Sequence, residues 1–131
     1  MGDIRYNTND KDLNAAAFVG LVNQIWPGNY QLDYTWEALE RTINITAWDG
    51  ETLVGCVRVL TDGYFFSTVA EILVLPAYRR QGIGRALMEL AFEAAPSSLI
   101  FGAQPQAEGF YEAIGYERLM RAFGKKKPRR Q

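Results

Sequence analysis

The chain has 131 residues, the size of one domain, and 48% of them are hydrophobic, 13% aromatic and 22% charged. This composition is typical of a folded globular protein and excludes a disordered one. Because the chain contains no histidine, Ser-His-Asp and Cys-His nucleophilic catalysis and histidine-ligated metals are excluded, and we expect no metal site.

Positive charge is concentrated at the C-terminus. Five of the 14 Lys and Arg residues lie between positions 125 and 130, and we interpret residues 125–131 as a flexible basic tail that follows a single domain over residues 1–124. The rest of the chain has nine basic and 15 acidic residues, which argues against a nucleic-acid-binding surface and suits a cationic substrate. A tail that binds an anion or a nucleic acid is the alternative interpretation.

Nothing in the sequence indicates secretion or a membrane. Cys56 is the one cysteine and cannot form an internal disulfide. No window approaches the roughly 18 apolar residues of a membrane span, and the N-terminus lacks the apolar region of a signal peptide. We therefore expect a cytoplasmic protein without a membrane partner.

Hydrophobic periodicity predicts helices and then an antiparallel sheet in the first half of the chain. A short strand at residues 4–6 precedes a helix over about residues 10–25, which ends before Pro27, and a shorter helix with Thr35 as its N-cap and Trp36 on its apolar stripe. Two strands joined by an Asp-Gly turn and a third strand then form a meander over residues 43–48, 52–60 and 64–75.

The second half of the chain alternates between helices and strands. Apolar residues at helical spacing predict a helix over residues 82–95, stopped by Pro96, and a second one from Ala107 to Ile114 that ends at Gly115. Short strands are expected at residues 98–103 and 116–123. The sequence therefore predicts an α+β fold with a mixed, mostly antiparallel central sheet flanked by helices.

The segment EILVLPAYRRQGIGRA, residues 71–86, is the most informative about function. An apolar strand leads into Pro76, a basic loop and two glycines at the start of a helix, where free N–H groups and the helix dipole favour an anion. A dinucleotide fingerprint would need a third glycine where Leu87 stands, and a Walker A loop would need Gly-Lys-Ser/Thr. The segment predicts a phosphate site flanked by Arg79, Arg80 and Arg85, and a purely structural turn is the alternative.

Two motifs resemble those of a known family. The segment Arg79-x-x-Gly82-x-Gly84 is similar to the acyl-CoA-binding motif of the GCN5-related N-acetyltransferases. Residues 110–116, FYEAIGY, resemble the family's Phe-Tyr-x-x-x-Gly-Phe segment, with a final Tyr in place of Phe. The matching regions span about residues 43 to 119, and Gln104 stands where members of the family often carry Asn.

The resemblance implies that acetyl-CoA is the co-substrate and that its acetyl group passes directly to a primary amine of a small molecule, peptide or protein, without a metal or a covalent enzyme intermediate. It also implies that backbone amides of the loop hold the pyrophosphate and that an N–H group at the end of the preceding strand meets the oxyanion. The residues expected to bind acetyl-CoA are Leu73, Val74, Leu75, Arg79, Arg80, Gln81, Gly82, Ile83, Gly84, Arg85, Gln104 and Tyr111.

Two residues are candidates for proton transfer. Glu71 is the one charged residue between Asp62 and Arg79, within an apolar strand, where a carboxylate needs a partner or a functional reason. The resemblance implies that Glu71 acts as the base, and an ion pair with Arg58 is the alternative. It also implies that Tyr111 protonates the leaving thiolate, for which packing on the apolar side of a helix is the alternative.

The acceptor site is expected in the connection between the first two helices. Trp26, Tyr30 and Trp36 lie near Asp33 and Glu37 in the sequence, and aromatic faces beside carboxylates suit an ammonium group; core packing is the alternative. Two other functions stay open: an acyl-CoA-binding regulatory module without turnover, and an interaction protein that acts through its basic tail. The apolar C-terminal strand also allows a homodimer.

Overall fold

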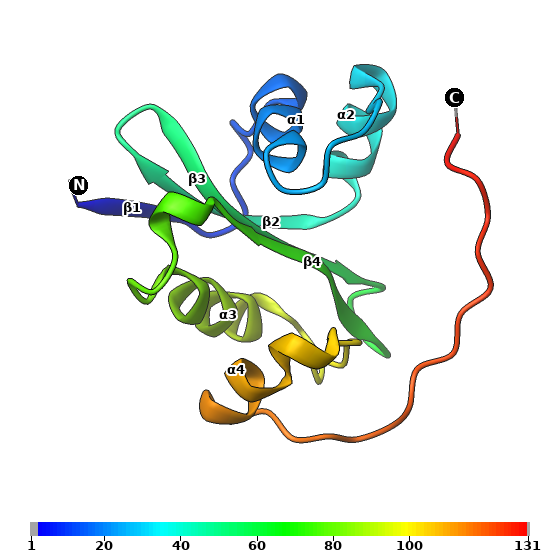
Figure 1. Cartoon of the computed structure of the whole chain (residues 1–131). Helices are drawn as coiled ribbons and strands as arrows, with labels where there is room; N and C mark the ends of the chain where they lie inside the picture. The colour runs from blue at the N-terminus through cyan, green and yellow to red at the C-terminus, as the bar shows by residue number, and fades with distance from the viewer. Residues whose placement is uncertain (1–2, 131) are drawn as a thin grey trace. The chain divides into compact units, whose positions relative to one another are not determined.

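The computed structural model describes residues 3–130 (Figure 1). Contacts divide the chain into two compact units, of which the first ends at Ile100 and the second begins at Phe101. The elements of the first unit are β1 (Ile4–Asn7), α1 (Ala15–Asn23), α2 (Leu32–Glu40), β2 (Ile43–Asp49), β3 (Thr52–Thr61), β4 (Ser67–Val74), the 3-10 turn η1 (Pro76–Tyr78) and α3 (Ile83–Ala94).

The strands form one sheet in the order β1-β2-β3-β4, and each neighbouring pair is antiparallel. The β2–β3 hairpin turns where the Asp-Gly signal predicts it, and Gly50 has a φ of +59°, a left-handed conformation that glycine adopts without strain. The only parallel pairing among residues 3–130 is an isolated bridge between Ser67 and Leu99. The predicted α+β fold with a mostly antiparallel sheet is confirmed.

A bulge interrupts the pairing of β3 with β4. Val59 pairs with Val69 and Arg58 pairs with Glu71, so that Ala70 is an extra residue on β4. A bulge of this kind bends its strand and increases the local twist. The bulge lies directly beside Glu71, the candidate base.

Helices cover both faces of the sheet in the first unit. Figure 1 shows α1 and α2 on one face and α3 on the other. A Cβ atom at Gly55 would lie 3.1 Å from the side chain of Leu87, so glycine on β3 permits the close approach of α3. On the opposite face, the Arg58 guanidinium lies over the ring of Phe18 on α1.

The first helix is shorter than the sequence predicts. α1 begins after Asn14, whose side chain accepts a hydrogen bond from the Ala17 N–H (2.8 Å) as an N-cap. The predicted start at residue 10 is wrong because the buried Asp10 carboxylate accepts hydrogen bonds from Thr46 (2.7 Å) and Trp48 (3.1 Å) on β2. Because the Asp10 side chain is hydrogen-bonded to β2, it cannot also cap the start of α1.

The second helix begins earlier than predicted. Thr35 is not the N-cap, because α2 starts at Leu32 and the Thr35 hydroxyl donates to the Gln31 carbonyl (2.7 Å) from within the first turn. A threonine can satisfy this carbonyl as readily as it can cap a helix. An N-cap and a position within the first turn of a helix are therefore hard to distinguish by residue type.

β4 begins three residues later than predicted. The Asp62 carboxylate accepts hydrogen bonds from the N–H groups of Tyr64 (2.9 Å), Phe65 (2.8 Å) and Phe66 (3.1 Å), and these bonds fold residues 62–66 into a turn. They also lower the pKa of the Asp62 carboxyl group. The three aromatic residues consequently belong to an exposed turn and not to the sheet.

The second unit contains η2 (Pro105–Ala107) and α4 (Glu108–Ala113). α4 falls within the predicted helical stripe, and Gly115 follows it with a φ of +102°, the left-handed conformation common after a helix. No helix between residues 3 and 130 is long and apolar enough to cross a bilayer; the longest, α3, has 12 residues.

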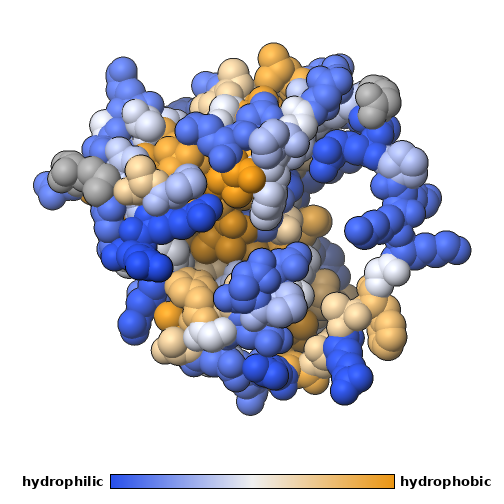
Figure 2. Space-filling model, viewed as in Figure 1, coloured by the Kyte–Doolittle hydropathy of each residue, from blue (hydrophilic) through white to orange (hydrophobic). Residues whose placement is uncertain are grey.

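The strands predicted at residues 98–103 and 116–123 are wrong for the part of the chain that the structure describes. The first is reduced to the bridge at Leu99, and the second is extended without a partner strand. An apolar pattern alone does not make a strand, because the ladder needs a neighbour to bond with. The chain runs on as an extended trace in Figure 1, and Figure 2 shows its final part, at the right of the view, as hydrophilic.

Candidate active site

A turn joins β4 to α3 and leaves the beginning of that helix open. Arg80 and Gly82 both have left-handed backbone, with φ of +64° and +84°, and the first intrahelical bond runs from the Ala86 N–H to the Gly82 carbonyl (3.0 Å). The N–H groups of residues 83–85 therefore have no partner within the helix, and Gly82, the N-cap, makes no side-chain cap. These N–H groups and the helix dipole can hold an anion.

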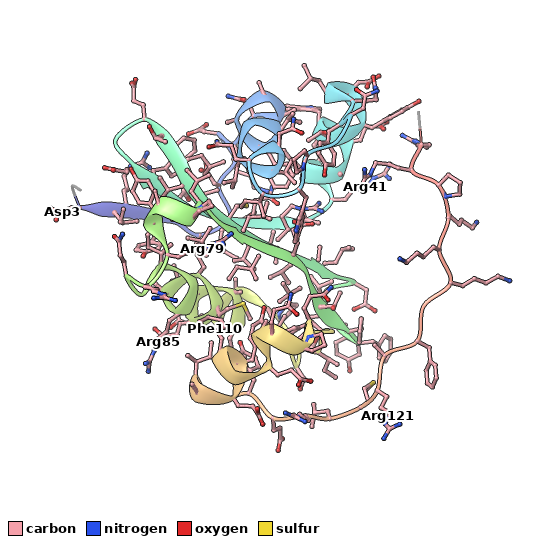
Figure 3. The ribbon with its side chains drawn as sticks, viewed as in Figure 1. Asp3, Arg41, Arg79, Arg85, Phe110 and Arg121 are labelled. Carbon is pink, nitrogen blue, oxygen red and sulfur yellow. The ribbon has the colours of Figure 1, made fainter. Side chains whose placement is uncertain are left out.

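Arginine side chains flank this turn. The Arg79 Nε donates to the Val74 carbonyl (3.0 Å), which folds the side chain back along the end of β4. Arg85, in the first turn of α3, pairs with Glu89 (3.2 Å) at the surface and extends away from the helix in Figure 3. Arg80 is exposed in the turn itself. The turn thus combines backbone donors with positive charge, the combination that binds phosphate.

β4 is the edge strand of the described sheet, and beyond the bridge at its first residue no strand pairs with its outer side. The Leu75 N–H donates to the Val54 carbonyl on β3 (2.9 Å). Because alternate residues of an antiparallel strand face opposite sides, Leu73 also faces β3 and Val74 faces outward. The contact of Arg79 with the Val74 carbonyl agrees with this direction. An extended ligand with amide groups can add to such an edge.

The turn is also attached to the β2–β3 hairpin. The Tyr78 hydroxyl donates to the Asp49 carboxylate (2.6 Å), and Asp49 is the last residue of β2. No local pattern in the sequence indicates this pair. Its members lie 29 positions apart, and Asp49 is already explained by the turn signal that it forms with Gly50.

Glu71 forms an ion pair on the face that α1 and α2 cover. Arg58 donates to one carboxylate oxygen through Nε and to the other through Nη2 (2.7 Å), and both side chains are less than one-fifth exposed. The guanidinium is also 5.4 Å from the centroid of the Phe18 ring. Burial, with the nearby Glu71 charge, raises the pKa of the Cys56 thiol, so this cysteine is a neutral packing residue.

The structure separates the three aromatic residues expected at the acceptor site. Trp36 lines an open cleft of about 230 Å³ together with Asp10, Lys11, Leu13, Leu39, Glu40 and Asn44. Trp26 and Tyr30 do not line that cleft; they lie in the connection from α1 to α2, where the Tyr30 hydroxyl donates to the Trp26 carbonyl (2.6 Å). About half of the Trp26 and Trp36 surface is exposed.

Gln104 and Tyr111 belong to the second unit. Tyr111, on α4, packs edge-to-face against Phe101, Phe110 and Tyr116, with ring centroids 4.8 to 6.1 Å apart. Burial, with a smaller effect of Tyr116, raises the pKa of the Tyr111 phenol. Gln104 is exposed and its carbonyl accepts from the Ala107 N–H (2.9 Å). The residues from Leu73 to Arg85, by contrast, meet in the first unit.

The sequence also matches a family that is defined independently of this site. The sequence model described as "Acetyltransferase (GNAT) domain" matches residues 40–118, which include β2, the whole turn from β4 to α3, and α4. The match covers more than half of the chain.

The chain belongs to the GNAT acetyltransferase family.

Curated relatives agree with membership of the GNAT family. The chain is 33% identical over 69 residues to "GCN5-related N-acetyltransferase 2, chloroplastic" of Arabidopsis thaliana, and this match covers 50% of the chain and 27% of the relative. It is 32% identical, also over 69 residues, to "Histone acetyltransferase TAP1" of Glycine max, covering 50% of the chain and 28% of the relative. The matches span only about a third or less of these relatives' length.

Two solved structures share the fold over nearly the whole of this chain. A putative acetyltransferase from Deinococcus radiodurans superposes with a TM-score of 0.80 at 22% identity, over 95% of this chain and 89% of that one. AAC(6')-Iy, solved with the bisubstrate analogue CoA-S-monomethyl-acetylneamine, gives 0.73 at 17% identity, over 97% and 99%. At these identities the likeness concerns the fold.

Proposed function

We propose that the chain is an acetyl-CoA-dependent N-acetyltransferase that transfers the acetyl group directly to a primary amine of a small molecule, a peptide or a protein. The observation that carries the proposal is the uncapped start of α3, between Arg79 and Arg85 and next to the open edge of β4. A pyrophosphate suits the uncapped start of α3, and an extended chain of amide groups suits the open edge of β4. Family membership and the CoA-containing analogue bound to AAC(6')-Iy support the same ligand.

Each part of acetyl-CoA has a proposed partner. The N–H groups of residues 82–85 bind the pyrophosphate, and Arg79, Arg80 and Gln81 contribute polar side chains around it. The pantetheine portion runs along the outer edge of β4 at Val74. Gln104 and Tyr111 stay proposed as cofactor-binding residues.

The reaction needs a proton acceptor, a proton donor and a partner for the oxyanion. The neutral amine attacks the thioester carbonyl carbon, a C–N bond forms, and the C–S bond breaks. We assign Glu71, directly or through water, as acceptor of the amine proton and Tyr111 as donor to the leaving thiolate. The outward N–H of Val74 meets the oxyanion. Arg58 holds the Glu71 carboxylate in one orientation while leaving it lone pairs to accept a proton.

The acceptor is proposed to be cationic. The first unit has seven basic and 12 acidic residues, and Trp36 stands in its cleft beside Glu40. Indole faces and carboxylates attract ammonium groups. We therefore propose Trp36 for acceptor recognition in the cleft. Trp26 and Tyr30, which lie in the connection from α1 to α2, are proposed for the same role from the sequence alone.

Titration calorimetry with acetyl-CoA and a thiol-release assay across an amine panel test the proposal. Binding together with release for one class of amine supports both the cofactor and the reaction. Binding without release for any amine would favour the regulatory module over the enzyme. Failure to bind acetyl-CoA would reject the assignment of the turn.

A further inference from the structure

We propose that the hydrogen bond between Tyr78 and Asp49 positions the turn formed by residues 79–82, so that this pair sets the affinity for the pyrophosphate part of the acyl-CoA. The inference rests on the proposed function and adds two positioning residues to its site. Neither residue is assigned to contact the ligand. Their role is to hold the backbone that does.

Asp49 is a fixed anchor. It is the last residue of β2, and its backbone is paired on both sides, with Ile4 on β1 and with Thr52 on β3. A carboxylate on a residue whose backbone is paired with both neighbouring strands has little freedom to follow a moving loop. A group that is hydrogen-bonded to the Asp49 carboxylate is therefore held in a fixed position relative to the sheet.

Tyr78 transmits that position to the turn. It is the last residue of η1, its N–H donates to the Leu75 carbonyl (2.8 Å), and its hydroxyl is 2.6 Å from Asp49 Oδ2. The hydrogen bond to Asp49, with a smaller effect of burial, raises the pKa of the Tyr78 phenol. The phenol consequently stays a hydrogen-bond donor across the neutral range.

The segment that follows has no regular structure. Four residues, 79–82, separate Tyr78 from the start of α3, and Arg80 and Gly82 among them have left-handed backbone. α3 fixes the far end of the segment, because Leu87 and Met88 are fully buried against the sheet. With Tyr78 bonded to Asp49, the turn spans two fixed points. Without that bond this end is held only by the backbone bonds of η1 and by the contact of Arg79 with the Val74 carbonyl. The end is then looser, and ordering it on binding costs affinity.

The predicted effect is confined to the phosphate-bearing ligand. Tyr78→Phe and Asp49→Ala should each weaken acetyl-CoA binding about three- to tenfold in calorimetry, the range for loss of one hydrogen bond. The inhibition constant of pantetheine, which lacks the pyrophosphate, should stay within about twofold, and kcat at saturating acetyl-CoA should not change. Asp49→Asn, which keeps an acceptor oxygen, should lose less affinity than Asp49→Ala.

Two comparisons separate positioning from a general loss of structure. The double variant Tyr78→Phe/Asp49→Ala should bind acetyl-CoA no more weakly than either single variant, because both remove the same bond. Tyr64→Phe removes a hydroxyl from the exposed turn at residues 62–66 and should leave the affinity unchanged. All variants should keep the wild-type circular dichroism spectrum.

Other results would overturn the inference. Equal acetyl-CoA affinity of wild type and Tyr78→Phe would reject the positioning role and leave the proposed function intact. Parallel weakening of acetyl-CoA and pantetheine, or a fall in kcat, would make the pair a general structural contact. If the wild type binds no acetyl-CoA, the proposed function fails and the inference with it.

Discussion

Glu71 and Arg58 lie directly opposite each other on β4 and β3, and the guanidinium of Arg58 donates to both carboxylate oxygens of Glu71. Glu71→Gln keeps the shape of the side chain but removes the proposed base. We expect kcat to fall at least about tenfold, with a change in the acid limb of the pH–rate profile. Because Arg58 loses its charged partner, the free energy of unfolding should also fall, by about 1–3 kcal/mol in urea titration.

The helix surface offers a matched control for that variant. Glu89→Gln removes the carboxylate of the Arg85–Glu89 pair, whose side chains are 63% and 61% exposed. Exposed pairs contribute little, so the stability should change by less than about 0.5 kcal/mol and kcat should stay the same. Wild-type rates in both variants would remove Glu71 from the mechanism.

Gly82→Glu should abolish acetyl-CoA binding. A Cβ atom at Gly82 meets no protein atom within 4 Å, so the new carboxylate would occupy the space proposed for the pyrophosphate and repel it. We expect the affinity to fall at least about 50-fold in calorimetry.

Gly63→Glu is the control for backbone strain. Gly63 has a φ of +88° against +84° at Gly82 and is likewise open to solvent. Both substitutions should therefore lower the melting temperature by a similar amount. If the two variants bind acetyl-CoA equally well, the pyrophosphate does not lie at Gly82.

Tyr111→Phe tests the proposed acid. Loss of the hydroxyl should lower kcat at least about tenfold while the dissociation constant of acetyl-CoA changes little. The pKa of Tyr111 is raised above its usual 10, so the phenol is protonated throughout the neutral range. The activity of the wild type should therefore fall through ionisation of the Tyr111 phenol only above pH 10.

Tyr116→Phe serves as the comparison, because Tyr116 belongs to the same aromatic cluster and its pKa is raised by burial as well. Steady-state rates of both variants, measured with one amine, should fall only for Tyr111. A similar fall in both would indicate that the cluster is needed for packing and not for proton transfer.

Gly55→Ala should destabilise the fold. The new Cβ would lie 3.1 Å from the Leu87 side chain and 3.2 Å from the Leu73 carbonyl, and the carbonyl cannot move aside without breaking the sheet. We expect a loss of about 1–3 kcal/mol in denaturant titration. Gly20→Ala in α1, where a Cβ has no atom within 4 Å, should instead be neutral or stabilising by up to about 1 kcal/mol. A change in the free energy of unfolding of the same sign in both variants would reject this account of the contact between Gly55 and α3.

Local signals predicted those elements whose partners are close in sequence. The β2–β3 hairpin follows from an Asp-Gly turn between two apolar strands, and α3 from a strong apolar stripe ended by Pro96. The turn at Gly82 could be predicted for the same reason, because its glycines and arginines are neighbours along the chain.

What the sequence missed depends on contacts between distant residues. Asp10 stands where the sequence pattern predicts the start of a helix, but its carboxylate accepts hydrogen bonds from Thr46 and Trp48, more than 30 positions away. Residues 116–123 have the composition of a strand but no strand to pair with among residues 3–130. The bond from Tyr78 to Asp49 has no signature in either residue's surroundings.

The bulge at position 70 decides to which side of the sheet the Glu71 carboxylate points. Val69 points to the same face as Val59, and strict alternation from there would turn position 71 toward α3. Ala70 adds one step, and the carboxylate emerges with Arg58 under α1 instead. A homologue with the same number of residues but a regular ladder here would present its carboxylate to α3, whereas one that lacks residue 70 would keep it opposite Arg58. Relatives of this chain should therefore be compared by the strand pairing around the glutamate as much as by residue identity.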